Sequence, residues 1–293
     1  MDRISTVPRT IVTGDPAQSL VEIVRINGGH DREPGSDAVA VEEPLEIRLG
    51  LSEHGRVRHQ AVSVTMRTPG NDFELAAGFL FTEGIIQRPD QVAGIKHCGG
   101  KNNPTNTVRL DLLDGVTVDI KRLERNFYTT SSCGVCGKTS LEALATGARK
   151  IDARGSFKVA ADLIETLAGK LREQQHTFKS TGGLHAAALF AGGGELLGVR
   201  EDVGRHNAVD KLIGSRFLAG ELPAHEAVLF LSGRASFELL QKAVMGGIPI
   251  VCAVGAPSSL AIAAAREFGV TLLGFVRDQR FNIYAGEERL AYA

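Results

Sequence analysis

The sequence predicts an α/β protein, α+β overall, in which a small mixed N-terminal domain precedes a C-terminal domain built on a largely parallel sheet. In the second half, apolar runs alternate with helical patterns, which is typical of a sheet covered by helices on both faces. In the first half, two strand patterns precede one helix and the turn signal Asp114-Gly115, which is typical of a small α+β unit.

Length and composition are those of an ordinary globular protein. The 293 residues are 43% hydrophobic and 23% charged, which is enough apolar material for a sizeable core. The 33 Lys and Arg residues nearly balance 34 Asp and Glu residues, so the formal net charge is -1. Because there is no global basic field, general binding to nucleic acid or to anionic membranes is disfavoured, while a local basic site is compatible with this balance.

The lack of a recognisable export signal and the small number of cysteines predict a cytoplasmic protein. The apolar run Ile248–Val254 is too short to span a bilayer, and the first eight residues lack the apolar stretch of a secretory signal. Four cysteines are too few for a disulfide scaffold, and Cys133 and Cys136 lie three residues apart. In a reducing cytoplasm such a pair usually indicates redox, metal or sulfur chemistry.

The N-terminal part is expected to consist of an irregular arm over residues 1–37 and an α+β domain over residues 38–126. The arm mixes charge, Gly and Pro, and has one short strand pattern at Ser19–Val24. In the domain, alternating residues predict strands, helical spacing predicts a helix that Gly84 ends, and the Asp-Gly turn predicts a hairpin. These elements cover Leu45–Leu51, Val57–Met66, Asn71–Thr82, Val108–Leu113 and Val116–Ile120.

A polar, Gly-rich loop over residues 127–138 is expected to separate the two domains and to be mobile. Thr139 and Glu142 form a capping-box pattern, so a helix should begin there and end near Gly147. The C-terminal domain covers residues 139–293. Its further helices and strands are expected at Ala160–Arg172, Leu184–Ala191, Glu195–Val199, Asn207–Phe217, Ala227–Leu231, Ala235–Met245, Ile248–Val254, Ser258–Phe268, Val270–Val276 and Phe281–Ala285.

Cys133 and Cys136 are the strongest candidates for chemistry. A glycine follows each cysteine and leaves its sulfur exposed, while Lys138 and the expected helix N-terminus favour the thiolate. Three uses of the pair remain open: a zinc site, a thioredoxin-like redox pair and a loop that carries persulfide sulfur.

The surroundings of the pair favour sulfur transfer. A zinc site needs two further ligands, for which only His97 and Cys98 are near. A thioredoxin-like pair follows a buried strand rather than a polar loop. Inert cysteines are normally buried among apolar residues, as Cys252 is inside its expected strand.

A ligand site is predicted at the C-terminal ends of three strands. In open α/β sheets ligands bind at this edge, where helix N-termini offer free N–H groups to anions and arginines form charge-assisted hydrogen bonds. Any one of these turns is more simply a turn or a cap, but three together favour a site for an anionic, nucleotide-like ligand. The turns are Ser232-Gly233-Arg234, Gly255-Ala256-Pro257-Ser258-Ser259 and Arg277-Asp278-Gln279-Arg280.

Two other polar stretches allow more than one interpretation. Arg200–Asn207 lies at a strand-to-helix junction and fits either a salt-bridged cap or part of a pocket. Ser180–His185 leads into a strand, where a lone histidine is more often structural than catalytic. The H-x-E and Pro-Cys-x-x-Cys pattern of zinc deaminases is absent from the sequence.

Several segments together resemble the FdhD family, the accessory sulfurtransferases of formate dehydrogenase maturation. The resemblance covers about residues 42–285 and is specific because several motifs occur in the same order. The matching segments are Met66–Gly70, Glu74–Leu80, Ser132–Gly137, Thr181–His185, Arg200–Lys211, Leu231–Glu238 and Phe275–Arg280.

This resemblance implies a sulfur carrier between a cysteine desulfurase and the bis(molybdopterin guanine dinucleotide) cofactor of formate dehydrogenase, with molybdenum or tungsten. It also implies a homodimer whose three-layer αβα C-terminal domain is similar to the cytidine deaminase fold, without catalytic zinc. The persulfide carrier of the family corresponds to Cys133. Its cofactor-binding stretch corresponds to Phe275, Val276, Arg277, Asp278, Gln279 and Arg280.

The leading hypothesis is a cytoplasmic sulfurtransferase with a cysteine persulfide intermediate, whose cofactor pocket includes the 275–280 stretch together with Ser232, Gly233, Gly255 and Ser258. GDP, as a fragment of the cofactor, should bind there without hydrolysis, because no P-loop is visible. The expected partners are the desulfurase, the catalytic subunit of formate dehydrogenase and a second copy of the chain, with no nucleic acid and no membrane. The alternative is a non-enzymatic, cofactor-binding chaperone whose cysteine pair holds a structural metal.

Overall fold

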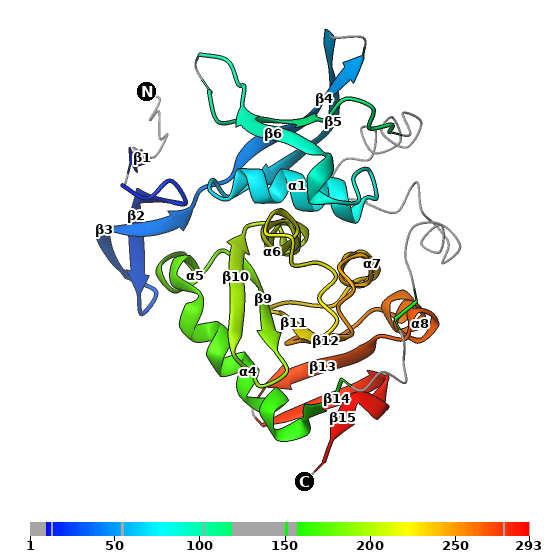
Figure 1. The fold of residues 1–293 in the computed structure, drawn as a ribbon. Coiled ribbons are helices and arrows are strands. Elements are labelled where there is room, and N and C mark those ends of the chain that lie inside the picture. Colours follow the sequence, from blue (N-terminus) through cyan, green and yellow to red (C-terminus); the bar gives the residue numbers. More distant parts are fainter. Residues whose placement is uncertain are drawn as a thin grey trace.

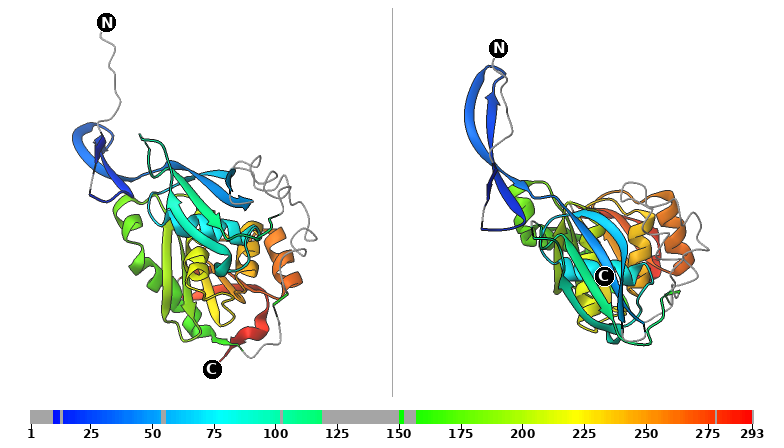
Figure 2. Two further views of the ribbon diagram at one scale, coloured as in Figure 1. Left: turned by 45° about the horizontal axis from the view of Figure 1, so that its top comes forward. Right: turned by 90° about the horizontal axis from the view of Figure 1, so that it is seen from above.

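Two main sheets organise the chain in the computed structural model, which describes residues 10–12, 14–53, 56–101, 103–118, 150–151, 157–277 and 279–292 (Figure 1). A four-stranded sheet belongs to the N-terminal part and a six-stranded sheet to the C-terminal part. Helices α1 (Asp72–Thr82) and α6 (Arg205–Leu218) pack against each other between the two sheets. A three-stranded sheet projects from this body as an N-terminal arm (Figure 2).

The arm is a regular β-sheet, so the prediction of a mostly irregular segment over residues 1–37 is wrong for the described part. β2 (Gln18–Asn27) pairs along its length with β3 (Asp31–Ala40), and β1 (Thr10–Val12) pairs with β2. The short strand expected at Ser19–Val24 lies within β2. Gly and Pro misled the prediction because β3 is an edge strand, where both residues are tolerated.

The N-terminal sheet has the order β5-β4-β7-β6. The two expected strands and the expected helix are confirmed as β4 (Glu43–Glu53), β5 (Arg56–Arg67) and α1. The expected hairpin is wrong, because 116–118 is not a strand. Instead β7 (Thr107–Leu112) pairs antiparallel with β6 (Val92–His97), which follows a 3₁₀ turn (Pro89–Gln91), and parallel with β4.

The C-terminal sheet has the order β10-β9-β11-β12-β13-β14. β11, β12 and β13 are parallel, whereas β9 and β14 run in the opposite direction. The sheet is therefore mixed rather than largely parallel, and the expected β9–β10 hairpin and folded-back β14 are confirmed. The strands are β9 (His185–Ala191), β10 (Leu196–Asp202), β11 (Ala227–Leu231), β12 (Ile250–Ala253), β13 (Thr271–Arg277) and β14 (Arg280–Ala285).

Helices cover both faces of this sheet. On one face α6, α7 (Phe237–Met245) and α8 (Ser259–Phe268) enclose a core that continues through α1 to the N-terminal sheet. On the other face α4 (Ala161–Gln174) covers a second, separate core. This is the expected αβα arrangement of three layers. A short parallel pair, β8 (Val159–Ala160) with β15 (Leu290–Ala291), and a 3₁₀ turn (Glu287–Arg289) lie near the C-terminus.

α1 and α6 cross at two glycines. A Cβ added at Gly78 would overlap the backbone oxygen of Asp210, and one added at Gly214 would overlap that of Glu74. The two helices can approach this closely only because neither position has a side chain. The crossing therefore fixes the N-terminal sheet against the C-terminal sheet and continues the apolar core between them.

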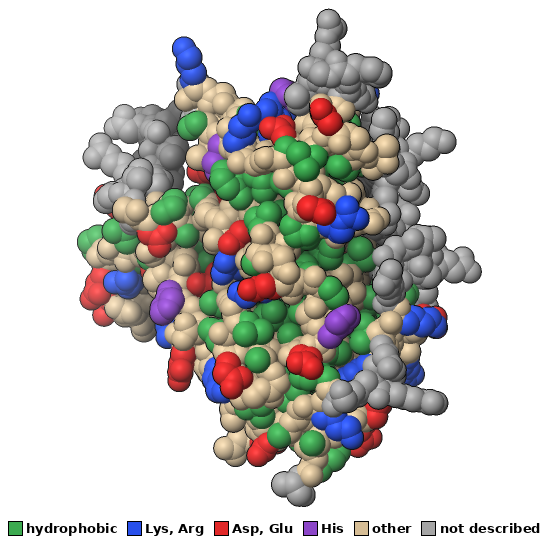
Figure 3. Space-filling model, in the orientation of Figure 1, with side chains coloured by type: hydrophobic (Ala, Val, Ile, Leu, Met, Phe, Trp, Pro, Cys, Tyr) green, Lys and Arg blue, Asp and Glu red, His purple; other side chains and the backbone are tan. Residues whose placement is uncertain are grey.

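The surface is of mixed character. Acidic and basic side chains are interspersed on the face seen in Figure 3, which agrees with the formal net charge of -1. In the described part of the chain, no helix combines the length and the apolar character that crossing a membrane requires.

Candidate functional site

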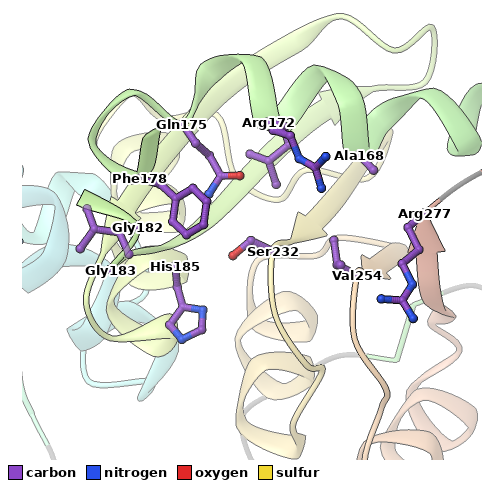
Figure 4. A pocket seen from close by; sticks show the side chains of 12 residues that line it. Ala168, Arg172, Gln175, Phe178, Gly182, Gly183, His185, Ser232, Val254 and Arg277 are labelled. Atoms are coloured by element: carbon purple, nitrogen blue, oxygen red, sulfur yellow. The ribbon is translucent and has the colours of Figure 1, made fainter. Parts of the chain in front are cut away.

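A pocket of about 520 Å³ opens at the edge of the C-terminal sheet where β11, β12 and β13 end, a size typical of small-molecule sites. α4 and the following short helix α5 (His176–Thr181) cover it from one side (Figure 4). Its lining residues are Ala168, Leu171, Arg172, Gln175, Phe178, Gly182, Gly183, Leu184, His185, Ser232, Val254 and Arg277. The pocket lies at the sheet edge that the sequence predicted.

Ser232 joins the end of β11 to the start of β9. Its backbone N–H donates to the carbonyl oxygen of Ala186 at 3.0 Å, and its Oγ accepts from the N–H of the same residue at 2.8 Å. Because Oγ acts here as an acceptor, its own proton is available for a ligand in the pocket. Ser232 is thus held in a fixed place with one free donor.

His185, at the start of β9, forms one end of the pocket (Figure 4). Its ring rests on Gly233, since a Cβ there would lie 3.3 Å from Nδ1. Burial lowers the pKa of His185, and the positive charges of Arg205, His206 and Arg234 lower it further, against a smaller opposite effect of Asp202. The neutral imidazole is therefore favoured at neutral pH.

Arg277 forms the other end of the pocket (Figure 4). Two positions before it, Phe275 has a φ of 56, a left-handed conformation that is strained for a bulky residue. The Phe275 N–H donates to the carbonyl oxygen of Gly255 at 3.2 Å, and the β13–β14 register shifts between Gly274 and Arg277. Past this irregularity, Val276 is buried in the core and Arg277 is exposed.

The remaining predicted residues lie around the pocket rather than in its lining. The Oγ of Ser258 accepts from the Ala261 N–H at 3.2 Å and so caps α8. Gly255 packs against Arg234, and a Cβ there would lie 3.2 Å from the backbone N of Arg234. Gln279 lies in the β13–β14 turn with a φ of 57. Asp278 lies outside the described residues.

Arg277 and Arg280 lie directly opposite each other across β13 and β14. Like charges in that position repel each other. Among the described residues neither guanidinium has a carboxylate or hydrogen-bond partner, and the same holds for Arg172 in the pocket lining. Arginines without partners that converge on one pocket are suited to bind an anion.

The Arg200–Asn207 stretch is for the most part a salt-bridged junction between the two halves of the chain. Arg200 Nη2 donates to Glu74 Oε1 at 2.7 Å, and Lys211 Nζ lies 2.7 Å from Asp202 Oδ2 in a pair that is 1% and 0% exposed. The same carboxylate accepts from the Thr68 N–H. Three parts of the stretch come near the pocket: Glu201 accepts from the N–H of the lining residue Phe178 at 2.9 Å, and Asp202 and the start of α6 act on His185 through their charges.

Cys133 and Cys136 lie outside the described residues, as does the whole 127–138 loop. The two described cysteines are Cys98, which is half-buried, and Cys252, which is buried in β12. Burial raises the pKa of the Cys252 thiol, so this residue does not form the reactive thiolate.

Of the twelve residues that line the pocket, the sequence had assigned only Ser232 and Arg277 to a site. The others include two with basic side chains, Arg172 and His185. Arg172 has the spacing of an ordinary solvent-facing position on α4, so nothing in its neighbourhood marks it. A lone histidine at the start of a strand is more often structural, so His185 was not assigned to the site. It is nevertheless the last residue of Thr181–His185, a segment that resembles the FdhD family. Its place opposite Arg277 depends on strand order, which local patterns do not give.

Comparisons with known proteins identify the family of the chain. The model of the FdhD/NarQ family matches residues 40–291, so the chain belongs to this family. A protein of Streptomyces avermitilis named sulfur carrier protein FdhD is 51% identical over 260 residues, which cover 87% of this chain and 89% of the relative. One of Sulfurisphaera tokodaii with the same name is 45% identical over 254 residues, covering 87% and 92%.

A solved structure also matches the fold. The crystal structure of a candidate formate dehydrogenase accessory protein from Desulfotalea psychrophila superposes with a TM-score of 0.71 at 25% sequence identity. The match covers 94% of this chain and all of the other. The arrangement of the sheets and helices is therefore shared with a protein of this kind.

Proposed function

We propose that this protein is a sulfur carrier in the maturation of formate dehydrogenase, taking sulfur from a cysteine desulfurase and transferring it to the bis(molybdopterin guanine dinucleotide) cofactor. The observation that carries the proposal is its 51% identity over 260 residues to a sulfur carrier protein FdhD, combined with an intact Cys133-Gly134-Val135-Cys136 motif. The proposed place of action is the cytoplasm. The proposed partners are the desulfurase, the formate dehydrogenase catalytic subunit and a second copy of the chain.

The proposed chemistry begins at Cys133. Its thiolate attacks the outer sulfur of the desulfurase persulfide, a new S–S bond forms on Cys133, and the desulfurase thiolate leaves. The outer sulfur then passes to the client cofactor, which is the substrate of the second step. Cys136 is proposed to resolve the persulfide in this step: its thiolate attacks the Sγ of Cys133, a Cys133–Cys136 disulfide forms, and the outer sulfur leaves as sulfide to the client cofactor. A thiol reductant then restores the two cysteines.

The strand-end pocket is proposed to hold a nucleotide part of the cofactor. Arg172 and Arg277 supply positive charge and have no carboxylate or hydrogen-bond partner in the described part of the chain, and Ser232 supplies a hydroxyl donor. These groups can donate charge-assisted hydrogen bonds to phosphate oxygens. Such hydrogen bonds are roughly twice as strong as those between neutral groups. GDP is the simplest probe of this pocket, and no hydrolysis is expected.

The sulfur-carrier role is tested by intact mass after incubation with a cysteine desulfurase and cysteine. The wild-type protein should gain sulfur, and Cys133→Ala should not gain it and should not activate formate dehydrogenase. Cys136→Ala should load sulfur but impair its transfer. Cys98→Ser is the matched control, because Cys98 lies in the N-terminal part and should leave loading unchanged.

Two results would contradict the proposal. Cys133→Ala protein that still activates formate dehydrogenase would exclude Cys133 as the carrier. Stoichiometric zinc held tightly by the purified protein and lost in Cys133→Ala would favour the alternative, a cofactor-binding chaperone with a structural metal at the cysteine pair.

A further inference from the structure

His185 differs from the other histidine near the pocket. His206 has a partner, since its Nε2 lies 2.8 Å from Glu238 Oε2. The imidazole of His185 makes no hydrogen bond or ion pair with any residue that the structure describes, although it is half-buried and lines the pocket. A half-buried ring without a partner at the end of a pocket is available to a ligand.

The position of the His185 ring is fixed by its neighbours. Gly233 packs against the ring, where any side chain would come within 3.3 Å of Nδ1. The backbone of His185 pairs with Asp202 across β9 and β10. Ser232 and Arg277 come from the ends of β11 and β13, so the three potential ligand contacts belong to three strands of one sheet. Such a rigid frame suits a site that is formed before the ligand arrives.

The charges that face His185 are mostly positive. Arg205 and His206 come from the start of α6, and Arg234 comes from the β11–α7 turn. Across the pocket are Arg172 from α4 and Arg277 from β13. Two of the negative groups nearby have cationic partners, since Asp202 pairs with Lys211 and Glu238 pairs with His206. A third, Glu201, accepts hydrogen bonds from the backbone N–H groups of Thr177 and Phe178 at the start of α5.

We propose that His185 is a phosphate-binding residue of this pocket, which takes up a proton as an anionic ligand enters and then donates a hydrogen bond to a phosphate oxygen. This inference rests on the proposed nucleotide pocket. It adds that binding of the nucleotide is accompanied by protonation of His185. The proton comes from solvent, and no covalent bond forms or breaks. In the free protein the surrounding positive charges disfavour protonation of the His185 ring. A bound phosphate offsets these charges and so favours the protonated ring.

The proposed protonation of His185 predicts how anion affinity changes with pH. The pKa of His185 lies below its ordinary value in the free protein and should rise when a phosphate binds. Affinity for the anion should therefore be highest below the free-state pKa and fall as pH rises through the window between the two values. The terminal phosphate of GDP itself protonates at about pH 6, which weakens binding in acid and acts in the opposite direction.

Calorimetry with GDP separates these contributions. At about pH 7.5 the phosphate is ionised, so titrations in two buffers of different ionisation enthalpy should show the wild-type protein taking up a fraction of a proton per GDP. His185→Gln should abolish this uptake and weaken GDP binding by about tenfold near pH 6.5, and by less as pH rises. His225→Gln is the matched control, because His225 is exposed just before β11, at the opposite end of that strand.

The outcomes distinguish the two proposals. Lost proton uptake in His185→Gln, with uptake retained in His225→Gln, is the expected result. GDP binding with the same uptake in wild type and His185→Gln would overturn the role of His185 and leave the nucleotide pocket standing. No GDP binding to the wild-type protein would overturn the nucleotide pocket itself, and the role of His185 with it, whereas sulfur loading on Cys133 would still be tested separately.

Discussion

The charges at the junction of the two halves and the charges at the strand-end pocket are arranged in opposite ways. At the junction, each of four buried or half-buried cations faces a carboxylate. The buried pairs are Arg67 with Asp72, Lys211 with Asp202 and Lys242 with Asp210, and the half-buried pair is Arg200 with Glu74. Arg172 and Arg277 line the pocket, Arg280 lies opposite Arg277 on the next strand, and none of the three has a carboxylate partner among the described residues. Within the described ranges, the cations of the junction are therefore paired, whereas the arginines at the pocket are not.

The difference in pairing distinguishes charged groups that stabilise the fold from charged groups that are available to a ligand. A buried charge is tolerated only when it is paired, because removing it from water costs several kcal/mol. Exposed arginines can stay solvated, yet placing Arg277 opposite Arg280 brings no benefit to the strands themselves. Such a placement is consistent with the anion-binding role proposed for the pocket. Substitutions at the two regions should therefore affect different properties.

The largest effect is expected at the junction, where Lys242 lies 2.8 Å from Asp210 and the two side chains are 7% and 3% exposed. Lys242→Met would leave the Asp210 carboxylate buried with only the Thr82 hydroxyl as its donor. Breaking such a pair costs about 3–5 kcal/mol. Urea denaturation should show this loss of unfolding free energy.

A double variant makes this test specific. Asp210→Leu combined with Lys242→Met removes both charges and should recover much of the loss, since an apolar replacement of a buried pair is often neutral. Equal destabilisation in the single and double variants would mean that packing, not the unpaired charge, is responsible. GDP affinity of the folded single variant should stay unchanged, because neither residue lines the pocket.

At the pocket, Arg277→Gln should show the reverse pattern. A charge-assisted contact contributes about 1.5–3 kcal/mol, so GDP binding should weaken by roughly ten- to hundredfold. The unfolding free energy should change by less than about 0.5 kcal/mol, as for other exposed positions. Calorimetry with GDP measures the first effect and urea denaturation the second.

Guanosine serves as the control for the Arg277 variant. It lacks phosphates, so any binding it shows should be equal in wild type and Arg277→Gln. An unchanged GDP affinity when both Arg277 and Arg280 are replaced would place the nucleotide elsewhere. Sulfur loading on Cys133 should survive these replacements, because meeting the desulfurase requires no nucleotide.

The pocket could be predicted from the sequence better than the charged pairs of the junction. The strand-end turns were found because polar residues after apolar strands have a recognisable local pattern, and Ser232 and Arg277 do line one pocket. The paired junction was left ambiguous, because Glu74 and Arg200 are 126 positions apart and no local pattern joins them. The β6–β7 hairpin was missed for a different reason: β6 has no buried residue, so no apolar pattern marks it as a strand.

Local signals failed elsewhere for a related reason. Asp114-Gly115 does form a turn, but the chain after it does not return along β7. The arm was misjudged because most of its small three-stranded sheet is exposed and shows no alternation of buried and exposed residues, as Val24 and Ile26 illustrate at 55% exposure each. The helices and strands with a buried face were predicted within a few residues, since burial imposes the periodicity that sequence analysis detects.

The smallest predicted effect concerns His206 and Glu238, which belong to both regions: they are paired like the junction residues, yet they lie beside His185. Their side chains are 29% and 24% exposed, so solvent screens the pair and its contribution should not exceed about 1 kcal/mol. The hydrogen bond from His206 lowers the pKa of Glu238, and burial opposes that shift.

The sign of the pH dependence follows from that shift. A carboxylate with a lowered folded-state pKa adds stability that is fully present above its unfolded-state pKa and is lost as pH falls through the folded-state value. Glu238→Gln should therefore be slightly less stable than wild type at mildly acidic pH, and the two unfolding free energies should converge as the solution becomes strongly acidic. Urea denaturation over a pH series measures this convergence. A stability difference that stays constant down to strong acid would show that the glutamine is destabilising through its packing, and that the His206–Glu238 pair contributes nothing through its charge.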